Sequence, residues 1–344
     1  MRSYLSNHRT LTENKSHTST KIDQIVAITC PFVSTGLFFG PSLINNLRMD
    51  KSKITSLIAA KTDRDGLTPT TIKGVQLFRA TQPVPCAPAV YEPCLIAIVS
   101  GAKEAVLDGR HFVYDSRRYL LCPMSMPIKA GTPNASAECP LYGVFISLDQ
   151  RVMTELALEM DNVGYRSNAP IAGRDTPGIH FADWDDRFTD ALSRLVTLTG
   201  DDTDAAVLGS DRLREVYYAV LRGQAGAFAR QAFGPGNKIA RSIAHVANNL
   251  DQTISIDDLA DRAGMSRAVF HRKFKQSTTM SPIQFVKSMR LNNAAMKIAG
   301  GMTIAEAAMD VGYVSASQFS REFKRLYGLS PREWGDSHEV TAVA

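Results

Sequence analysis

Apolar and polar positions along the chain change their spacing twice. From about residue 68 to residue 148, short apolar runs alternate with turns, and prolines interrupt the runs repeatedly. From residue 149 to residue 233, apolar residues recur every three to four positions, which is the spacing of a helix face. From residue 237 onward, short helical patterns follow one another with brief turns between them. The spacing therefore predicts a β-rich unit, a helical region and a second, all-helical unit.

The β-rich unit contains one strong hairpin signal. Two β-prone runs flank Asp108-Gly109 in KEAVLDGRHFVYD, and this dipeptide favours a two-residue hairpin turn. The neighbouring runs CLIAIVSG, RRYLLCP and LYGVFISLD are short and are bounded by turn residues. Many short strands with frequent turns predict a small barrel or sandwich over residues 65–149.

Three segments of residues 150–233 read as helices: RVMTELALEM, DWDDRFTDALSRLVTL and SDRLREVYYAVLRGQAGAFARQAF. Asp183 and Ser210 are the expected N-caps of the second and third, because short polar side chains accept hydrogen bonds from free backbone N–H groups. We expect this region to relay a signal or to mediate dimerisation. The stretch FGPGN, residues 233–237, reads as a linker.

Residues 1–64 are expected to form an N-terminal extension, and residues 336–344 a disordered tail. Up to Thr20 the extension is rich in Ser, Thr, Asn and His, a composition typical of disorder. Met49 opens MDKSKITSLIAA, which reads as a natural helical start. This raises the hypothesis that residues 1–48 are absent from the native protein, which mass spectrometry of natively expressed protein would test.

Composition places the basic charge mainly in the last unit. The chain has 344 residues, 44% of them hydrophobic, which is enough to bury a core. From Asn237 onward there are 14 Lys and Arg against 10 Asp and Glu, whereas the whole chain carries only +5. A polyanionic partner is therefore expected at the last unit. The five cysteines include no CxxC motif, and no apolar run is long enough to span a membrane, so we expect a cytoplasmic protein without a structural zinc site.

The last unit contains one pattern twice, in ISIDDLADRAGMSRAVFHRKFKQ and MTIAEAAMDVGYVSASQFSREFKR. Each copy is a short helix, a turn with Gly264 or Gly312, and a second helix that starts at Ser266 or Ser315. This is the helix-turn-helix pattern, in which the turn glycine tolerates a positive φ. A connector over residues 282–299 would measure about 27 Å if fully helical, and one turn of DNA is roughly 34 Å.

The second helix of such a unit enters the major groove of DNA. Small residues at its start let the backbone approach, hydroxyls and Arg reach base edges, and later cations meet phosphates. The expected base-reading residues are Arg267, Ala268, His271, Arg272, Ala316, Ser317, Ser320 and Arg321. The expected phosphate contacts are Ser266, Lys275, Ser315, Lys324 and Arg325.

These motifs, with SPIQFVKSMRLNNA and SQFSREFKRLYGLSPREW, make residues 238–334 resemble the C-terminal domain of the AraC/XylS family of bacterial transcription regulators. The segment from GVQLFRA to LYGVFISLD resembles the cupin-like regulatory domain of one AraC-type subgroup. The resemblance implies an α+β multidomain fold: a small cupin-like barrel at 65–149, helices at 150–233, and a double helix-turn-helix domain at 237–335. It also implies double-stranded DNA, RNA polymerase and an effector as partners, and an activator bound at the nucleoid. A monomer and a homodimer both stay open.

Two sites in the last unit depart from the family pattern. Asn292-Asn293 lie in the connector where charged residues are usual. Ala268 offers only a methyl group where some members carry a large base-contacting residue, so the first unit is expected to read fewer bases.

The signal is expected to be a small molecule or a redox change. Cys94, Cys122 and Cys139 are candidate redox sensors, with small buried apolar residues as the alternative. His111 is the single histidine of residues 65–149, so we expect no metal, no cofactor and no catalytic residue. Two other functions stay open: a metal-dependent cupin enzyme fused to a DNA-targeting domain, and a nucleoid binder without sequence preference, whose affinity salt would set.

Overall fold

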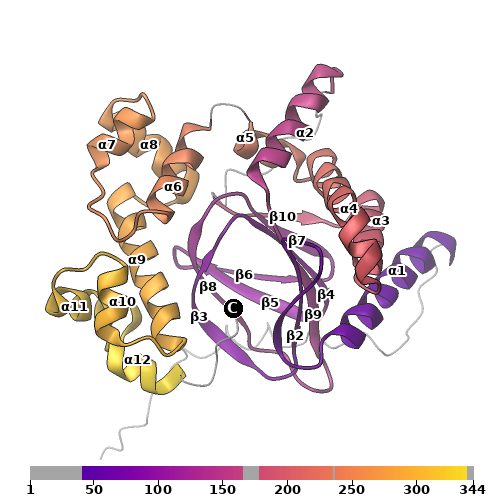
Figure 1. Cartoon of the computed structure of the whole chain (residues 1–344), viewed down its shortest axis with the longest axis horizontal. Coiled ribbons are helices and arrows are strands. Elements are labelled where there is room, and N and C mark those ends of the chain that lie inside the picture. The colour runs from indigo at the N-terminus through magenta and orange to yellow at the C-terminus, as the bar shows by residue number, and fades with distance from the viewer. Residues whose placement is uncertain (1–40, 166–177, 235–236, 339–344) are drawn as a thin grey trace, which may run out of the picture. The chain divides into compact units, whose positions relative to one another are not determined.

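The computed structural model describes residues 41–165, 178–234 and 237–338 (Figure 1). The strands are β1 (Gly66–Pro69), β2 (Val75–Ala80), β3 (Val84–Tyr91), β4 (Cys94–Ser100), β5 (Ala102–Leu107), β6 (Arg110–Asp115), β7 (Arg118–Cys122), β8 (Met126–Thr132), β9 (Leu141–Ser147) and β10 (His180–Asp183). The helices of the first two thirds are α1 (Pro41–Lys61), α2 (Gln150–Asn162), α3 (Asp186–Leu198), α4 (Asp202–Arg222) and α5 (Gly226–Phe233). The last third contains α6 (Lys238–Ala247), α7 (Ile256–Arg262), α8 (Arg267–Thr278), α9 (Pro282–Ala299), α10 (Ile304–Asp310), α11 (Ala316–Tyr327) and α12 (Pro331–His338).

The strands form two antiparallel sheets, which we call the β domain. The six-stranded sheet has the order β1-β2-β9-β4-β7-β10, and the four-stranded sheet has the order β3-β8-β5-β6. β5 and β6 pair as the predicted hairpin, with Leu107 opposite Arg110. The two turn residues, Asp108 and Gly109, have φ values of 49° and 74°, so both adopt the positive φ that a tight hairpin turn requires.

β4 shows why the β domain has two hydrophobic cores. Alternate side chains of a strand point to opposite faces of its sheet. Leu95, Ala97 and Val99 belong to the core beneath the helices, whereas Cys94, Ile96 and Ile98 belong to the core of the other face. A strand covered on both faces reads as a continuous apolar run, as CLIAIVS does.

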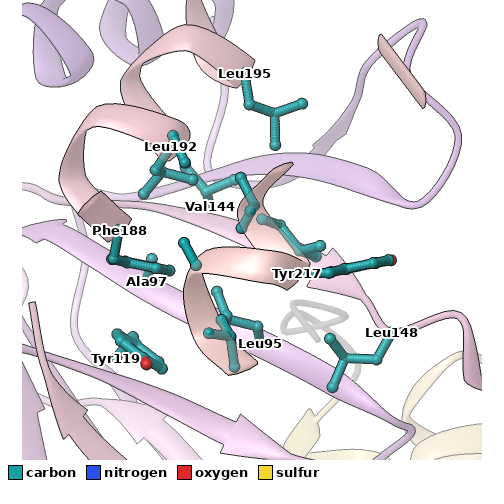
Figure 2. Packing of buried hydrophobic residues seen from close by; sticks show 14 of the residues in the cluster. Leu95, Ala97, Tyr119, Val144, Leu148, Phe188, Leu192, Leu195 and Tyr217 are labelled. Atoms are coloured by element: carbon teal, nitrogen blue, oxygen red, sulfur yellow. The ribbon is translucent and has the colours of Figure 1, made fainter. Parts of the chain in front are cut away.

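Helices α1, α3 and α4 cover the first of these cores (Figure 1). Leu192 and Leu195 of α3 share one core with Leu95 and Val144 of the sheet, and Tyr217 of α4 lies in the same core near Leu148, as Figure 2 shows. The Tyr217 hydroxyl donates a hydrogen bond of 2.5 Å to the carbonyl oxygen of Ser147. The helices predicted at 150–233 therefore pack on one face of the six-stranded sheet.

Both predicted N-caps of this region were wrong. α3 begins after Asp185, whose side chain accepts the N–H of Phe188. Asp183 instead lies in β10, a four-residue strand too short for a periodicity to reveal. α4 begins after Asp201, whose side chain accepts the N–H groups of Thr203 and Asp204, and the helix runs through Ser210 without a break.

Part of the predicted N-terminal extension belongs to this core. α1 begins at Pro41 rather than at Met49, and its residues Ile54 and Ile58 are fully buried. The disorder expected up to Thr20, two linker residues (235–236) and residues 339–344 of the expected tail lie outside the described residues. The start of the expected tail was wrong, because α12 continues through residues 336–338. Among the described helices, none is both long and apolar enough to cross a membrane.

Helices α6–α12 contain the repeated pattern at the places that the sequence indicates. α9 has the predicted bounds, and its N-cap Ser281 forms a capping box with Gln284. Thr303, the N-cap of the short helix α10, forms a capping box with Glu306. Each box satisfies backbone N–H groups that would otherwise be free at a helix start, so both helix starts are fixed by local sequence.

Candidate nucleic-acid interface

Two helix-turn-helix units, α7–α8 and α10–α11, follow one another in the last third. Their turn glycines have the predicted positive φ, 58° at Gly264 and 83° at Gly312. A Cβ atom at Gly312 would lie 2.5 Å from the carbonyl oxygen of Leu250, so a side chain would clash there. The small residues Ala260 and Ala307 are buried, as expected where the second helix crosses the first.

The second unit presents a small, polar and then basic face. α11 starts after Ser315, whose hydroxyl accepts the N–H of Gln318 at 3.3 Å. Phe319 and Phe323 are fully buried on the core side. The other side carries the predicted DNA-contact residues, all exposed except the half-buried Ser320; they are Ser315, Ala316, Ser317, Ser320, Arg321, Lys324 and Arg325.

The first unit repeats this arrangement. α8 starts after Ser266 and buries Phe270 and Phe274, which correspond to Phe319 and Phe323 of α11. All of its predicted DNA-contact residues are exposed: Ser266, Arg267, Ala268, His271, Arg272 and Lys275. We call these exposed sides of α8 and α11 the reading faces. Which residues contact bases and which contact phosphates stays a prediction.

Arg267 has an acidic partner that the sequence did not reveal. Its guanidinium donates hydrogen bonds of 3.1 and 2.9 Å to the two carboxylate oxygens of Asp257, in the first turn of α7. Both side chains are more than 60% exposed. An ion pair this exposed is typically worth about 0–1 kcal/mol. Arg267 can therefore leave Asp257 for a DNA contact at little cost.

The connector α9 fixes both reading helices. The rings of Phe274 on α8 and Phe285 on α9 meet edge to face at 5.2 Å. On the other side, Lys287 of α9 forms an ion pair of 2.9 Å with Glu322 of α11, and the Tyr313 hydroxyl donates to the same carboxylate at 2.7 Å. The sequence signal for this cluster was a lone acid, Glu322, on an otherwise basic helix.

Glu322 is held in its charged form. Partial burial opposes its ionisation, but the hydrogen bonds from Tyr313 and Lys287 outweigh that effect and lower the pKa of Glu322 below its usual value. In turn, burial and the Glu322 carboxylate raise the pKa of Tyr313, so its phenol stays protonated and keeps donating. The contact between α9 and α11 is therefore charge-assisted.

Asn292, noted as a departure from the family pattern, joins α9 to the β domain. It is 5% exposed, and its Nδ2 donates to the carbonyl oxygens of Ala89 on β3 (2.8 Å) and Ile128 on β8 (3.0 Å). Its Oδ1 accepts the hydroxyl of Tyr327 on α11 at 2.6 Å. The side chain thus meets both sheet and reading helix, whereas the Asn293 amide bonds to Met289 of its own helix.

A cavity of about 460 Å³ lies beside this contact. Its lining includes Lys129 of β8, Lys287 of α9 and Arg325 of α11, together with Asn292 and Glu322. The ammonium group of Lys129 also lies 5.9 Å from the centre of the Tyr327 ring. The volume is within the range of small-molecule sites in proteins.

The three candidate sensor cysteines lie in different surroundings. Cys94 and Cys122 are opposite one another on β4 and β7, and both are fully buried. Burial and the neighbouring Cys122 raise the pKa of Cys94 well above its ordinary value, which disfavours the reactive thiolate. Cys139 is half-buried in the loop before β9. Buried small apolar residues were the alternative interpretation for this set, and Cys94 and Cys122 have that environment.

Two family models match the chain. The N-terminal domain of AraC-type transcriptional regulators matches residues 71–228, and a helix-turn-helix domain matches residues 259–337. The first covers most of the β domain with helices α2–α4, and the second covers both reading helices.

Curated relatives align with about a quarter of the chain. The chain is 32% identical to the transposon Tn10 TetD protein of Escherichia coli over 87 residues, which are 25% of this chain and 63% of TetD. It is 32% identical to the regulatory protein SoxS of Escherichia coli K12 over 93 residues, 27% of this chain and 87% of SoxS. Several other relatives are longer, and the chain spans only about a third of their length, as with MtrA of Neisseria gonorrhoeae.

Among solved structures, ToxT from Vibrio cholerae O395 aligns with 78% of this chain and all of its own, with a TM-score of 0.48 at 14% identity. The two family models and the SoxS match agree with the repeated helix-turn-helix geometry. The chain therefore belongs to the AraC family of DNA-binding transcription regulators, with a regulatory domain ahead of the helix-turn-helix domain.

Proposed function

We propose that this regulator reads DNA sequence with two helices at once and that its β domain controls the reading. The observation that carries the proposal is the pair of exposed, basic reading faces held by a single connector. α9 has 18 residues and is about 27 Å long. This is close to the roughly 34 Å between successive major-groove segments on one face of DNA.

The chemistry along each reading helix supports separate roles for its two ends. Ala316 and Ser317 at the start of α11 leave room for the backbone at the groove floor. Arg272 and Arg321 follow one and a half turns later, where a guanidinium can donate two hydrogen bonds to the O6 and N7 atoms of guanine. Lys275 and Lys324 lie farther along and fit phosphate contacts, which add affinity without sequence preference.

Control by the β domain would act through Asn292 and the adjoining cavity. A small molecule that bound among Lys129, Lys287 and Arg325 would change the contacts that hold α9 on β3 and β8. Such a ligand alters DNA binding only if it binds two arrangements of the chain with unequal affinity. The lining has three cationic side chains against the two carboxylates of Asp108 and Glu322, which favours an anionic effector. RNA polymerase as a partner, a cytoplasmic location and homodimer formation are proposals that rest on the family.

The test is in vitro selection of DNA from a random pool by the full chain at fixed, near-physiological salt. We expect enrichment of a two-part motif with its halves about one helical turn apart. Enrichment of one half only would mean that one unit reads bases, and Ala268 marks the first unit as the silent one. No enrichment, together with affinity that depends only on salt, would support a binder without sequence preference.

The relatives are transcription regulators, which favours a sensing role for the β domain over the metal-dependent enzyme that the sequence left open. A parallel measurement distinguishes the effector proposal from the DNA proposal. Candidate anions that shift the melting temperature of the full chain but leave DNA affinity unchanged would contradict control through this cavity.

A further inference from the structure

Three side chains with metal-binding atoms meet on the four-stranded sheet. Cys86 comes from β3, Glu104 from β5 and His111 from β6. His111 Nε2 lies 2.8 Å from Glu104 Oε2, and Cys86 Sγ lies 3.7 Å from the same oxygen. All three ligand atoms lie within 4.8 Å of one another. The sequence gives no sign of this cluster, because Glu104 is 18 positions from Cys86 and 7 from His111, and no motif links them.

The fold explains how residues from non-adjacent strands meet. β8 lies between β3 and β5, and Gly131 is the β8 residue opposite Glu104. A Cβ atom at Gly131 would lie 2.7 Å from the backbone nitrogen of Cys86. Because Gly131 has no side chain, nothing on β8 separates the Cys86 thiol from the Glu104 carboxylate. His111 pairs with Val106, two residues from Glu104 and on the same face.

This face points away from the core between the two sheets. Ala105 and Leu107, which flank the outward-facing positions along β5, are buried in that core. The side chain of His111 is 52% exposed and that of Glu104 is 17% exposed. A cation could therefore enter from solvent and keep a water ligand, while one carboxylate is already partly shielded.

We propose that Cys86, Glu104 and His111 bind a divalent transition-metal cation of the Zn²⁺ type. One thiolate, one imidazole and one carboxylate are the ligand kinds that zinc takes, at about 2.0–2.3 Å each, with water completing the tetrahedron. The thiolate and imidazole disfavour Mg²⁺ and Ca²⁺, which prefer oxygen ligands. The present separations of the ligand atoms, a few ångströms, are close to the edges of such a tetrahedron. The metal site itself does not depend on the proposed function.

A metal bound here would also affect the connector α9, and this regulatory proposal rests on the proposed function. The cation would link β3 to β5 across β8. The two carbonyl groups that accept Asn292 belong to Ala89 on β3 and Ile128 on β8. Fixing these strands together would change how firmly they hold α9. The site is therefore suited to make DNA binding depend on metal supply.

The experiment titrates the metal-free full chain with Co²⁺, which reports its ligands by absorption, and then displaces Co²⁺ with Zn²⁺. We expect one Co²⁺ per chain and a thiolate-to-cobalt charge-transfer band in the near ultraviolet. Cys86→Ser should abolish the band, and His111→Gln should weaken Zn²⁺ binding by about 100-fold or more, since even the loss of an outer hydrogen bond to a ligand costs 10–100-fold.

Cys139→Ser is the matched control, because Cys139 is a second half-buried cysteine of the β domain outside the cluster. It should leave the band and the Zn²⁺ affinity unchanged. The exposed His111 makes His111→Gln the safer variant if Cys86→Ser fails to fold, which circular dichroism without metal would show. A band that persists in Cys86→Ser, or equal Zn²⁺ affinity in wild type and His111→Gln, overturns the proposal.

Measuring DNA affinity with and without Zn²⁺ tests separately the proposal that the metal regulates DNA binding. A shift that disappears in His111→Gln supports it. Unchanged DNA affinity in a chain that binds one Zn²⁺ overturns the proposal that the metal regulates DNA binding. A chain that binds Zn²⁺ as expected but selects no DNA sequence overturns the proposed function and leaves the metal site supported.

Discussion

Arg272 and Arg321 occupy the same place on their two helices, six residues after the starting serines Ser266 and Ser315. Both are exposed, and both follow a buried phenylalanine two residues earlier. Because the two arginines have equivalent positions, their contributions to DNA binding can be compared directly.

Replacing either arginine by alanine should cost about 1–3 kcal/mol of binding to the selected site and relax base preference at one position. The measurement is DNA affinity against the selected site and a set of single-base variants at constant salt. Arg187→Ala, an exposed arginine on α3, is the control and should bind as wild type. Equal weakening on random DNA would assign the arginine to phosphate contact instead.

At this scale the sequence predicted positions better than partners. The three-to-four spacing was enough to predict which side of α8 and α11 is exposed, because the buried phenylalanines define the other side. The ion pair of Arg267 with Asp257 was not predictable, since it joins two helices whose relative orientation only the turn determines. The cluster of Cys86, Glu104 and His111 was not predictable either, because it joins three strands that only the sheet brings together.

The connector α9 is the element on which the proposed reading depends. It contacts the first unit through an aromatic pair and the second through Lys287 and Glu322. The second contact should respond to pH, because the pKa of Glu322 is lower in the folded chain than in the unfolded chain. A lowered carboxyl pKa contributes stability that is complete above the unfolded pKa of about 4.3 and disappears as pH falls through the folded pKa.

Glu322→Gln should therefore destabilise the chain at pH 7 by about 1.5–3 kcal/mol, the range for hydrogen bonds to a charged group. It should also flatten the loss of stability of the wild type below about pH 5. Urea unfolding at several pH values measures both. Asp310→Asn, which breaks the more exposed ion pair of α9 with Lys297, is the control and should cost well under 1 kcal/mol. If the variant has the same pH profile of stability as the wild type, the charge of Glu322 does not stabilise the contact between α9 and α11.

Elements were predicted well where local signals agree. α9 begins at the predicted residue behind a capping box, and the Asp-Gly turn has its two positive φ values. Predictions failed where tertiary packing overrode the local signal. α4 begins at the cap that Asp201 provides and continues through Ser210, and β10 forms by pairing with β7.

For the whole molecule, the decisive contact is Asn292. No periodicity or motif predicts that a connector helix meets the β domain, and its only trace was an unusual pair of asparagines. The side chain satisfies two sheet carbonyl groups and a tyrosine hydroxyl while almost fully buried. Buried polar groups that lose a partner are costly, so the contact is sensitive to substitution.

Asn292→Ala should lower the stability of the full chain by about 1–3 kcal/mol and weaken any effect of an effector on DNA affinity. Asn293→Ala, the neighbouring residue with a bond inside its own helix, should cost less and leave effector response intact. Calorimetry and DNA binding on both variants make the comparison. Equal effects of the two substitutions would mean that the contact with the sheet carries no coupling.

The two reading helices also give the protein a direction. A symmetric dimer sees the same site from either end, but α8 and α11 differ in sequence and lie on one chain, so the chain has a front and a back. A site without a palindrome would therefore fix the orientation of the bound protein relative to the promoter. Reversing such a site while keeping its position would move the β domain from the upstream to the downstream side. The influence of the protein on transcription should then depend on the orientation of the site.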